Sequence, residues 1–217
     1  MRLLAGSAIV LGFFAMTLFG AAGGLNLPFF WGYVCVVAAT TITVCAVMDR
    51  DLMKERIKPG AGGTDRQLRL IATPFFLAHL IVAGLDVGRF HFSDTVPVWL
   101  RTVGLAGMAV FLALPLWAVS VNRFFSPVVR IQEERGHHLV TAGPYRVVRH
   151  PGYLGAIFAF PFGGMGLGSW LSLAPLAIPV LLILRRTIIE DRYLSKNLDG
   201  YQEYALRVRW RLVPGVW

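Results

Sequence analysis

Residues 98–121 read VWLRTVGLAGMAVFLALPLWAVSV, a run in which Arg101 is the only charged side chain. A helix of about 20 apolar residues is long enough to cross the hydrocarbon core of a bilayer. The run therefore predicts a membrane-spanning helix. We expect a kink at Pro115, which a spanning helix tolerates because its neighbours satisfy the freed backbone groups.

Further apolar stretches flank this run on both sides. Two lie at 3–24 and 28–48 and are separated only by uncharged residues, which predicts a tight helical hairpin. A third covers 70–87, and the stretch 151–187 is long enough for two arms joined by a turn at 168–170. The chain is therefore expected to be an all-α, polytopic transmembrane helical bundle of about six spans.

The composition of the whole chain supports this class. Of the 217 residues, 56% are hydrophobic and only 15% are charged, whereas a soluble domain carries about 25% charged residues. The mean hydropathy is +0.61. These values exclude an ordinary soluble globule and a disordered chain, and they argue against a nucleic-acid-binding domain despite the formal net charge of +9.

The positive charge is unevenly distributed along the chain. Nineteen of the 21 Lys and Arg residues lie at the N-terminus, in 49–69, in 122–150 and from residue 185 onward. With six spans these regions share one face, and basic residues favour the cytoplasmic face. We therefore expect both termini in the cytoplasm, an inner or plasma membrane if the source is prokaryotic, and contacts of the basic residues with anionic membrane lipid.

Two regions follow from this pattern. Residues 1–121 are expected to form the N-terminal transmembrane helices, with a cytoplasmic loop at 49–69 that the Pro and Gly residues of 58–63 indicate. Residues 122–217 are expected to form a C-terminal catalytic region with a polar segment, the hairpin 151–187 and an amphipathic tail. Basic and apolar residues alternate at 207–212, which predicts a strand or extended segment lying on the membrane. No Cys and His spacing typical of zinc is present, so no metal is expected.

The polar segment 132–153 reads QEERGHHLVTAGPYRVVRHPGY and concentrates hydrogen-bonding groups beside the membrane. Pro151 suits the first position of a helix, so His150 is predicted to cap that helix. The free N–H groups after His150 would attract an anion such as a carboxylate, and Arg149 adds positive charge. A basic segment that reaches toward lipid headgroups is the alternative interpretation.

Four motifs stand in order along the C-terminal part of the chain: GPYRVVRHPGYLG at 143–155, RTIIED at 186–191, GYQEY at 200–204 and LVP at 212–214. Together they resemble the signature of the isoprenylcysteine carboxyl methyltransferase and phospholipid methyltransferase superfamily. ERIKPG at 55–60 and the pair Asp65-Arg66 look like a bacterial subgroup of it. The resemblance implies a prokaryotic integral-membrane methyltransferase that uses S-adenosylmethionine without a Rossmann domain and releases S-adenosylhomocysteine.

The resemblance also implies a cofactor pocket at the cytoplasmic face, formed by the C-terminal half of the chain. Arg186 matches the family's substrate-side arginine, and Arg149 is a second substrate-binding candidate. Glu190 suits the ammonium or a ribose hydroxyl of the cofactor, and it shares a helix face with Arg186. The implied cofactor contacts are Gln132, His137, His138, Leu139, Val140, Tyr145, His150, Pro151, Gly152, Tyr153 and Glu190.

The expected reaction is methyl transfer to a carboxylate or an amine of a lipophilic or amphipathic substrate, either a small molecule or a lipidated one. A carboxylate needs no general base, whereas an amine must lose a proton, for which Glu190 or His150 is the candidate. Two alternatives stay open from the sequence. One is a membrane reductase of the sterol type that uses NADPH, and the other is a non-enzymatic membrane subunit.

Two further features are expected to be structural. His79 lies in the middle of the run 70–87, where it either lines a substrate tunnel or, as we favour, is a neutral, hydrogen-bonded histidine. The glycines at 163, 164, 166 and 168 resemble a phosphate loop, but no strand precedes them. Small residues allow membrane helices to approach closely, so these glycines are predicted to serve helix packing.

Overall fold

The computed structural model describes residues 2–217, with side chains from residue 6 onward. Within these residues no β-strand occurs, and Thr64 and Val129 form one isolated bridge. The all-α class is therefore confirmed. The helices are α1 (Arg2–Ala22), α2 (Pro28–Val47), α3 (Arg50–Ile57), α4 (Leu68–Leu85), α5 (Val98–Val121), α6 (Pro151–Leu167), α7 (Leu173–Asn197) and α8 (Tyr201–Arg207).

Three segments are long and apolar enough to cross a membrane: α2, α5, and α4 together with the π-helical turn that continues it to Phe90. Helix α1 contributes a shorter apolar stretch, Gly6–Ala22. Helix α6 has 17 residues, and the 25 residues of α7 include a charged C-terminal part. The predicted runs thus coincide with helices, while the number of six spans stays a prediction.

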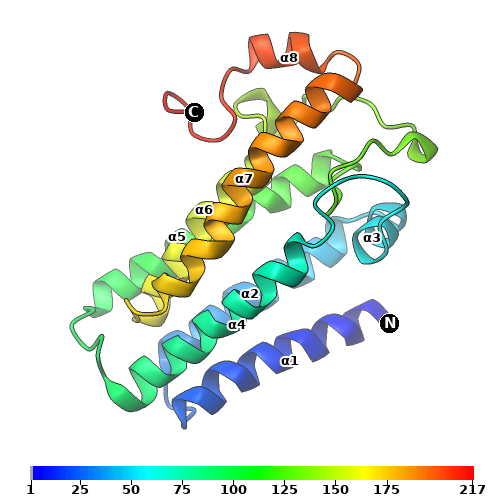
Figure 1. Ribbon diagram of the computed structural model, residues 1–217. Helices are drawn as coiled ribbons and strands as arrows, with labels where there is room; N and C mark the ends of the chain where they lie inside the picture. The colour runs from blue at the N-terminus through cyan, green and yellow to red at the C-terminus, as the bar shows by residue number, and fades with distance from the viewer. Residues whose placement is uncertain (1) are drawn as a thin grey trace.

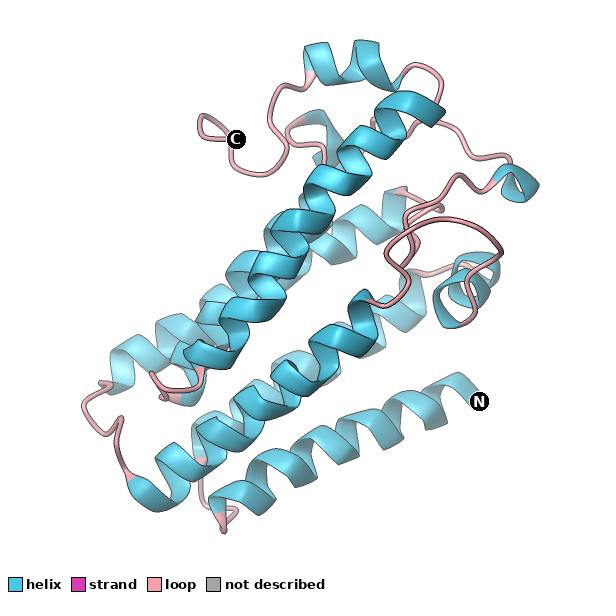
Figure 2. Cartoon of the chain, in the orientation of Figure 1, coloured by secondary structure: helices cyan, strands magenta, loops and turns pink. Residues whose placement is uncertain are grey.

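The ends of the bundle differ in character. Figure 1 shows the N-terminus, α3, α8 and the C-terminal end of α7 toward one end of the bundle. The connections between α1 and α2, between α4 and α5, and between α6 and α7 lie at the opposite end. In Figure 2 the longest loop segments gather at the α3 and α8 end. The polar segment between α5 and α6 therefore meets α3 and α8 at one end of the bundle.

The loop expected at 49–69 is only partly a loop, because α3 occupies its first third. Asp49 caps this helix, and its Oδ1 accepts hydrogen bonds from the N–H groups of Asp51 and Leu52 at 2.9 and 2.7 Å. Such a cap satisfies two backbone donors that a helix start otherwise leaves free. The short helix then packs inward through Leu52, which is buried.

The C-terminal tail also differs from the expectation. Helix α7 continues past residue 187 to Asn197, and Arg207 ends the short helix α8. The expected strand at 207–212 does not form. Instead, the carbonyls of Trp210 and Arg211 accept hydrogen bonds from the N–H groups of Arg149 and His150, each at 2.9 Å. The tail is therefore held against the segment that precedes α6.

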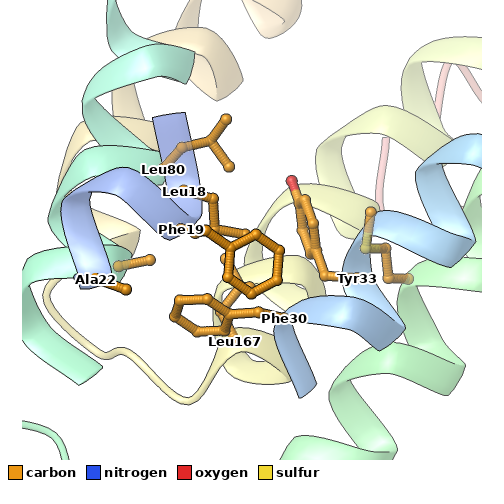
Figure 3. Packing of buried hydrophobic residues seen from close by; sticks show 9 residues of the cluster. Leu18, Phe19, Ala22, Phe30, Tyr33, Leu80 and Leu167 are labelled. Carbon is orange, nitrogen blue, oxygen red and sulfur yellow. The ribbon is translucent and has the colours of Figure 1, made fainter. Parts of the chain in front are cut away.

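The hydrophobic core joins five helices near the end with the short connections. Phe19 of α1 and Phe30 of α2 have ring centroids 5.9 Å apart, and Figure 3 shows them facing one another beside Leu167 of α6. Burial of such apolar side chains from several helices fixes their relative positions. The buried members of this cluster are Leu18, Phe19, Ala22, Phe30, Tyr33, Leu80, Ala83, Met108 and Leu167.

Helices α5 and α6 pack more closely than any side chain would allow at several points. A Cβ on Gly104 would lie 2.3 Å from the backbone nitrogen of Gly166, and a Cβ on Gly155 would lie 2.5 Å from the carbonyl oxygen of Phe111. The predicted packing role of the glycine-rich stretch in α6 is therefore confirmed for Gly166. The Gly155 contact lies near the start of α6, close to the end of the polar segment.

Replacing Gly155 by alanine tests the closeness of this contact. The added methyl would meet backbone rather than a movable side chain, so we expect a loss of about 1–3 kcal/mol in stability from overpacking. Thermal unfolding of the detergent-purified protein measures it. Gly12→Ala on α1 is the matched control, because a Cβ there meets nothing within 4 Å. Equal unfolding temperatures for both variants would contradict the packing described.

Candidate functional site

A polar cavity lies between the segment 122–153, the C-terminal part of α7, and α8. It contains about 770 Å³ of empty space, part of it open to solvent. The structure brings ten of the eleven predicted cofactor contacts to its wall. They are His137, His138, Leu139, Val140, Tyr145, His150, Pro151, Gly152, Tyr153 and Glu190.

The start of α6 forms one side of this cavity. His150 is the residue before the helix and Pro151 is its first residue, as the sequence predicted. The N–H groups of Tyr153 and Leu154 both bond to the carbonyl of His150 at 3.1 Å. Because Pro151 and Gly152 line the cavity, the partial positive charge of the helix N-terminus faces it.

Tyr153 connects α6 to the two charged residues of α7. Its hydroxyl donates to Glu190 Oε2 at 2.5 Å and accepts from Arg186 Nε at 2.6 Å. Arg186 Nε also lies 3.7 Å from Glu190 Oε2, so the pair shares a helix face as predicted. The side chain of Arg186 is 3% exposed and that of Glu190 is 23% exposed. Glu190 is thus fixed in place and still reachable from the cavity.

Asp191 holds together the elements around the cavity. Burial opposes its ionisation, but hydrogen bonds from His150, Arg149 and Arg211 lower the pKa of this carboxyl well below its usual range. Arg149 approaches it through Nε and Nη2 at 2.8 and 3.1 Å, and Arg211 through Nε at 2.8 Å. The hydroxyl of Tyr201 donates to it at 2.9 Å. One carboxylate therefore joins α7, the start of α6, α8 and the tail.

Arg149, a predicted substrate contact, has its guanidinium committed within the protein. Besides the two bonds to Asp191, its Nη1 donates to the carbonyls of Val208 and Arg209 at 2.7 and 2.9 Å. Although it contributes to the cavity wall, these bonds use most of its donors. The geometry favours a role for Arg149 in positioning the tail.

Gln132 does not reach the cavity wall. It is fully buried, and its Nε2 donates to the carbonyl of Phe124 at 2.8 Å while its Oε1 accepts from Arg135. Its backbone N–H donates to His137 Nδ1 at 3.2 Å. Gln132 therefore shapes the loop that carries the cavity residue His137.

His137 is a neutral group of the cavity wall. Its ring stacks on Phe124 with centroids 4.5 Å apart, and burial lowers its pKa to about 4, with the nearby His138 adding to the effect. Because Nδ1 accepts a hydrogen bond, the ring proton of the neutral form resides on Nε2. His137 can therefore donate a hydrogen bond to a ligand without carrying charge.

The helix α3 supports the cavity from outside. Glu55 accepts hydrogen bonds from Arg130 Nε and Nη2 at 3.0 and 2.8 Å, from Ser126 at 2.7 Å and from the Gly60 N–H at 3.1 Å. Burial opposes ionisation, yet Arg130, Ser126 and Gly60 lower the pKa of Glu55 to about 2. A single charged residue thus ties the loop 58–63 to the segment after α5.

A second group of charged side chains lies around Arg186, and the sequence analysis did not predict it. Arg186 Nη1 lies 3.6 Å from Asp65 Oδ2, and Arg69 Nη2 donates to the carbonyl of Arg56 at 2.7 Å. Burial lowers the pKa of Arg56 to about 10, and repulsion from Arg69 adds to this. The ERIKPG stretch and Asp65 were recognised as motif residues. Their contact with Arg186 was not predicted, because they lie far from Arg186 in the sequence.

Comparison with known proteins agrees with this geometry. Residues 105–196 match the sequence model of the isoprenylcysteine carboxyl methyltransferase (ICMT) family. These residues include Tyr153, Arg186 and Glu190. The match covers less than half of the 217 residues, and over that part the chain is similar to this family.

Curated proteins that are similar to this chain come from plants and bacteria. A "Probable protein-S-isoprenylcysteine O-methyltransferase" of Oryza sativa subsp. indica is 32% identical over 95 residues, which is 43% of this chain and 50% of the relative. The "Protein-S-isoprenylcysteine O-methyltransferase B" of Arabidopsis thaliana is 29% identical, covering 51% and 57%. The "Cobalt-zinc-cadmium resistance protein CzcN" of Cupriavidus metallidurans is 30% identical, covering 58% and 56%. The chain thus spans only about half the length of the relatives it matches.

Substituting Asp191 tests the anchor of the site. Asp191→Asn removes the charge that faces Arg149 and Arg211, and breaking a buried ion pair costs about 3–5 kcal/mol. We expect a large fall in unfolding temperature at neutral pH. Since the folded pKa is depressed, the contribution of Asp191 is present above about pH 4 and is lost as pH falls further, so the difference between the variants narrows in acid.

The matched control is Asp199→Asn, because Asp199 lies on the exposed turn between α7 and α8. It should unfold at the temperature of the native protein. If Asp191→Asn also unfolded at the temperature of the native protein, the anchoring role of Asp191 would be wrong.

Proposed function

We propose that this chain is an integral-membrane methyltransferase that uses S-adenosylmethionine and methylates a carboxylate on a lipophilic substrate. The observation that carries the proposal is the polar cavity whose wall residues Tyr153 and Glu190 are hydrogen-bonded to each other, with Arg186 bonded to Tyr153 from behind the wall. The family match over residues 105–196 supports the reaction type. The names of the plant relatives support a lipidated acceptor.

The residues at the cavity fit S-adenosylmethionine, which supplies the activated methyl group when bound. Glu190 would hold its ammonium or a ribose hydroxyl, and the N-terminus of α6 suits its carboxylate. Tyr145 and Tyr153 offer aromatic faces to an adenine or a sulfonium. His137 offers a neutral donor. The remaining predicted contacts, His138, Leu139 and Val140, complete the wall.

The charges beside the cavity favour a carboxylate acceptor over an amine. Burial is the main cause of the lowered pKa of Arg56, and repulsion from Arg69 and Arg186 adds to it. Asp65 and Glu190 are carboxylates that ion-pair with Arg186. An anion entering this group relieves the repulsion, whereas a protonated amine would add to it. A carboxylate also needs no general base to become a nucleophile.

An apolar groove continues from these arginines along α4 and α7. Leu68 and Arg69 line one end of it, and Ile183 and Pro179 line it on α7. The aliphatic part of the Arg69 side chain can cover apolar surface of the groove while its guanidinium stays at the polar end of the groove. The groove thus suits the chain of an acceptor whose carboxylate lies at the arginines.

The protein's own part in the reaction is to align the reactants. Tyr153 fixes Glu190, and Arg186 uses its Nε on Tyr153. Its Nη1 lies 3.6 Å from Asp65, so an acceptor carboxylate would share this guanidinium with Asp65. Correct alignment can lower a barrier by roughly 7–11 kcal/mol. Burial of Arg186 strengthens its attraction for an anion because the surroundings are poorly polarisable.

The orientation that we propose follows from the same residues. Most basic side chains and both termini belong to the end of the bundle that carries α3 and α8 (Figure 1). Basic residues favour the cytoplasmic face. The cofactor would then enter from the cytoplasm, with six spans in the inner or plasma membrane, and the acceptor would enter from the bilayer.

Binding of S-adenosylhomocysteine to the purified protein tests the cofactor assignment. Loss of a charged hydrogen-bond partner costs about 1.5–3 kcal/mol, so Glu190→Gln should weaken binding by at least tenfold in calorimetry. Glu203→Gln on the exposed side of α8 is the control and should bind normally. NADPH is the control ligand, because binding of NADPH instead would favour the reductase, and binding of neither would favour a non-enzymatic subunit.

Chains of equal length and different charge test the acceptor assignment. Hexadecanoic acid should bind the protein loaded with S-adenosylhomocysteine at least tenfold more tightly than hexadecylamine. Arg69→Gln should reduce this preference, since it removes one cation of the group. Lys58→Gln, on the exposed loop after α3, should leave it unchanged. A preference for the amine would sink the carboxylate proposal and leave the cofactor proposal standing.

A further inference from the structure

A second cavity lies inside the bundle, away from the polar site. It contains about 880 Å³ of empty space, part of it open to the surroundings, and is lined by side chains of α1, α2, α4, α5, α6 and α7. None of the residues that line it lines the polar cavity. Its wall is apolar except for two threonines, Tyr33 and His79. The hydroxyls of Thr40 and Thr41 donate to carbonyls of their own helix, so their protons are not available to a ligand.

His79 presents a hydrogen-bond acceptor to this cavity. The residue is 1% exposed, and its Nδ1 lies 2.9 Å from the carbonyl oxygen of Ser172. A carbonyl only accepts, so Nδ1 carries the proton, and in the neutral ring Nε2 is left with a lone pair. Among the side chains that the structure describes, none hydrogen-bonds to Nε2.

Tyr33 presents a hydroxyl to the same cavity. The residue is 5% exposed, and Figure 3 shows its hydroxyl on the side away from Phe30 and Leu167. Within the described residues this hydroxyl makes no hydrogen bond. The rings of Tyr33 and His79 lie with centroids 6.3 Å apart. Two buried polar groups without partners cost free energy that a matching ligand recovers.

We propose that this cavity binds an uncharged lipophilic molecule that carries a hydroxyl group. One hydroxyl donates to Nε2 of His79 and accepts from the hydroxyl of Tyr33, which satisfies both groups at once. A ketone or an ester accepts only, and it leaves Nε2 unpaired. A charged headgroup is excluded because the wall offers no opposite charge. The apolar remainder of the cavity takes the hydrocarbon part of the molecule.

The cavity adjoins the α4 and α7 groove, since Phe14, Phe76 and Phe160 line both. Arg69 and His79 stand on the same helix about 15 Å apart, from a rise of about 1.5 Å per residue. The hydroxyl therefore belongs either to a separate bilayer molecule or to the far end of the methyl acceptor. The second source rests on the proposed function, whereas the cavity itself does not.

The test compares 1-hexadecanol with hexadecane, measured by native mass spectrometry of the protein released from detergent. The native protein should retain the alcohol at least tenfold better than the alkane. Tyr33→Phe removes only the hydroxyl and should abolish most of this preference. Ala159→Leu fills part of the cavity, because Ala159 is a buried wall residue, and should reduce retention of the alcohol. Gly12→Ala on the outside of α1 is the control for folding.

The outcomes separate the two sources. If 16-hydroxyhexadecanoic acid loses affinity on both Tyr33→Phe and Arg69→Gln, one molecule extends from the cavity to the arginines. If only Tyr33→Phe weakens it, the cavity holds a separate molecule. Equal retention of alcohol and alkane by the native protein and Tyr33→Phe would overturn the proposal, and would leave the two polar groups to a bridging water. Binding of S-adenosylhomocysteine, measured by calorimetry, tests the proposed cofactor site separately and does not depend on what binds in this cavity.

Discussion

The buried carboxylate of Asp191 is the interaction on which the polar end of the molecule depends. It gathers Arg149, His150, Tyr201 and Arg211 from three parts of the chain. A charge that is desolvated to this degree is stable only when its partners saturate it. The residue before α6, His150, and the tail residue Arg211 are therefore held at the same carboxylate. The neighbouring residue Glu190 is left free to face the cavity.

The difference between Glu190 and Asp191 follows from their places on one helix. Adjacent residues on a helix point about 100° apart, so one carboxylate enters the core of the polar segment and the other borders the cavity. Glu190 is held by a tyrosine and an arginine of the same cavity edge, while its side chain stays 23% exposed. The acidic pair thus divides into a structural and a ligand-facing member, which sequence spacing alone does not reveal.

Much of the fold was predictable because the period and length of apolar runs decide it. The helix over 98–121 and the helix start at Pro151 were predicted to the residue. Helix α3 was missed because its stability comes from the Asp49 cap and from Glu55 bonding to Arg130, a contact between distant segments. The tail at 208–212 forms no strand, because the carbonyls of Trp210 and Arg211 bond to the loop residues Arg149 and His150 and no regular ladder is built.

The candidate site was predicted through its motifs, and the part outside them was not. Ten of the eleven implied contacts line one cavity, because the motifs lie on consecutive segments whose order fixes their meeting. Gln132 turned inward, since a buried loop needs an amide to bond the carbonyl of Phe124. Arg56, Arg69 and Asp65 come from a region outside the family match. Their meeting with Arg186 depends on tertiary packing that no local pattern encodes.

The two cavities suggest how one small bundle keeps water-soluble and lipid-soluble ligands apart. The polar cavity is bounded by side chains whose charges are paired across segments, and it opens at the end that carries α3 and α8. The inner cavity is bounded by apolar side chains, and its polar atoms are uncharged. A charged ligand is therefore costly in the inner cavity, and a hydrocarbon chain gains little in the polar one. The groove beside Arg69 shares Phe14, Phe76 and Phe160 with the inner cavity and carries a charged side chain at its other end. The two ends of an amphiphile in this groove would therefore be separated by solvation.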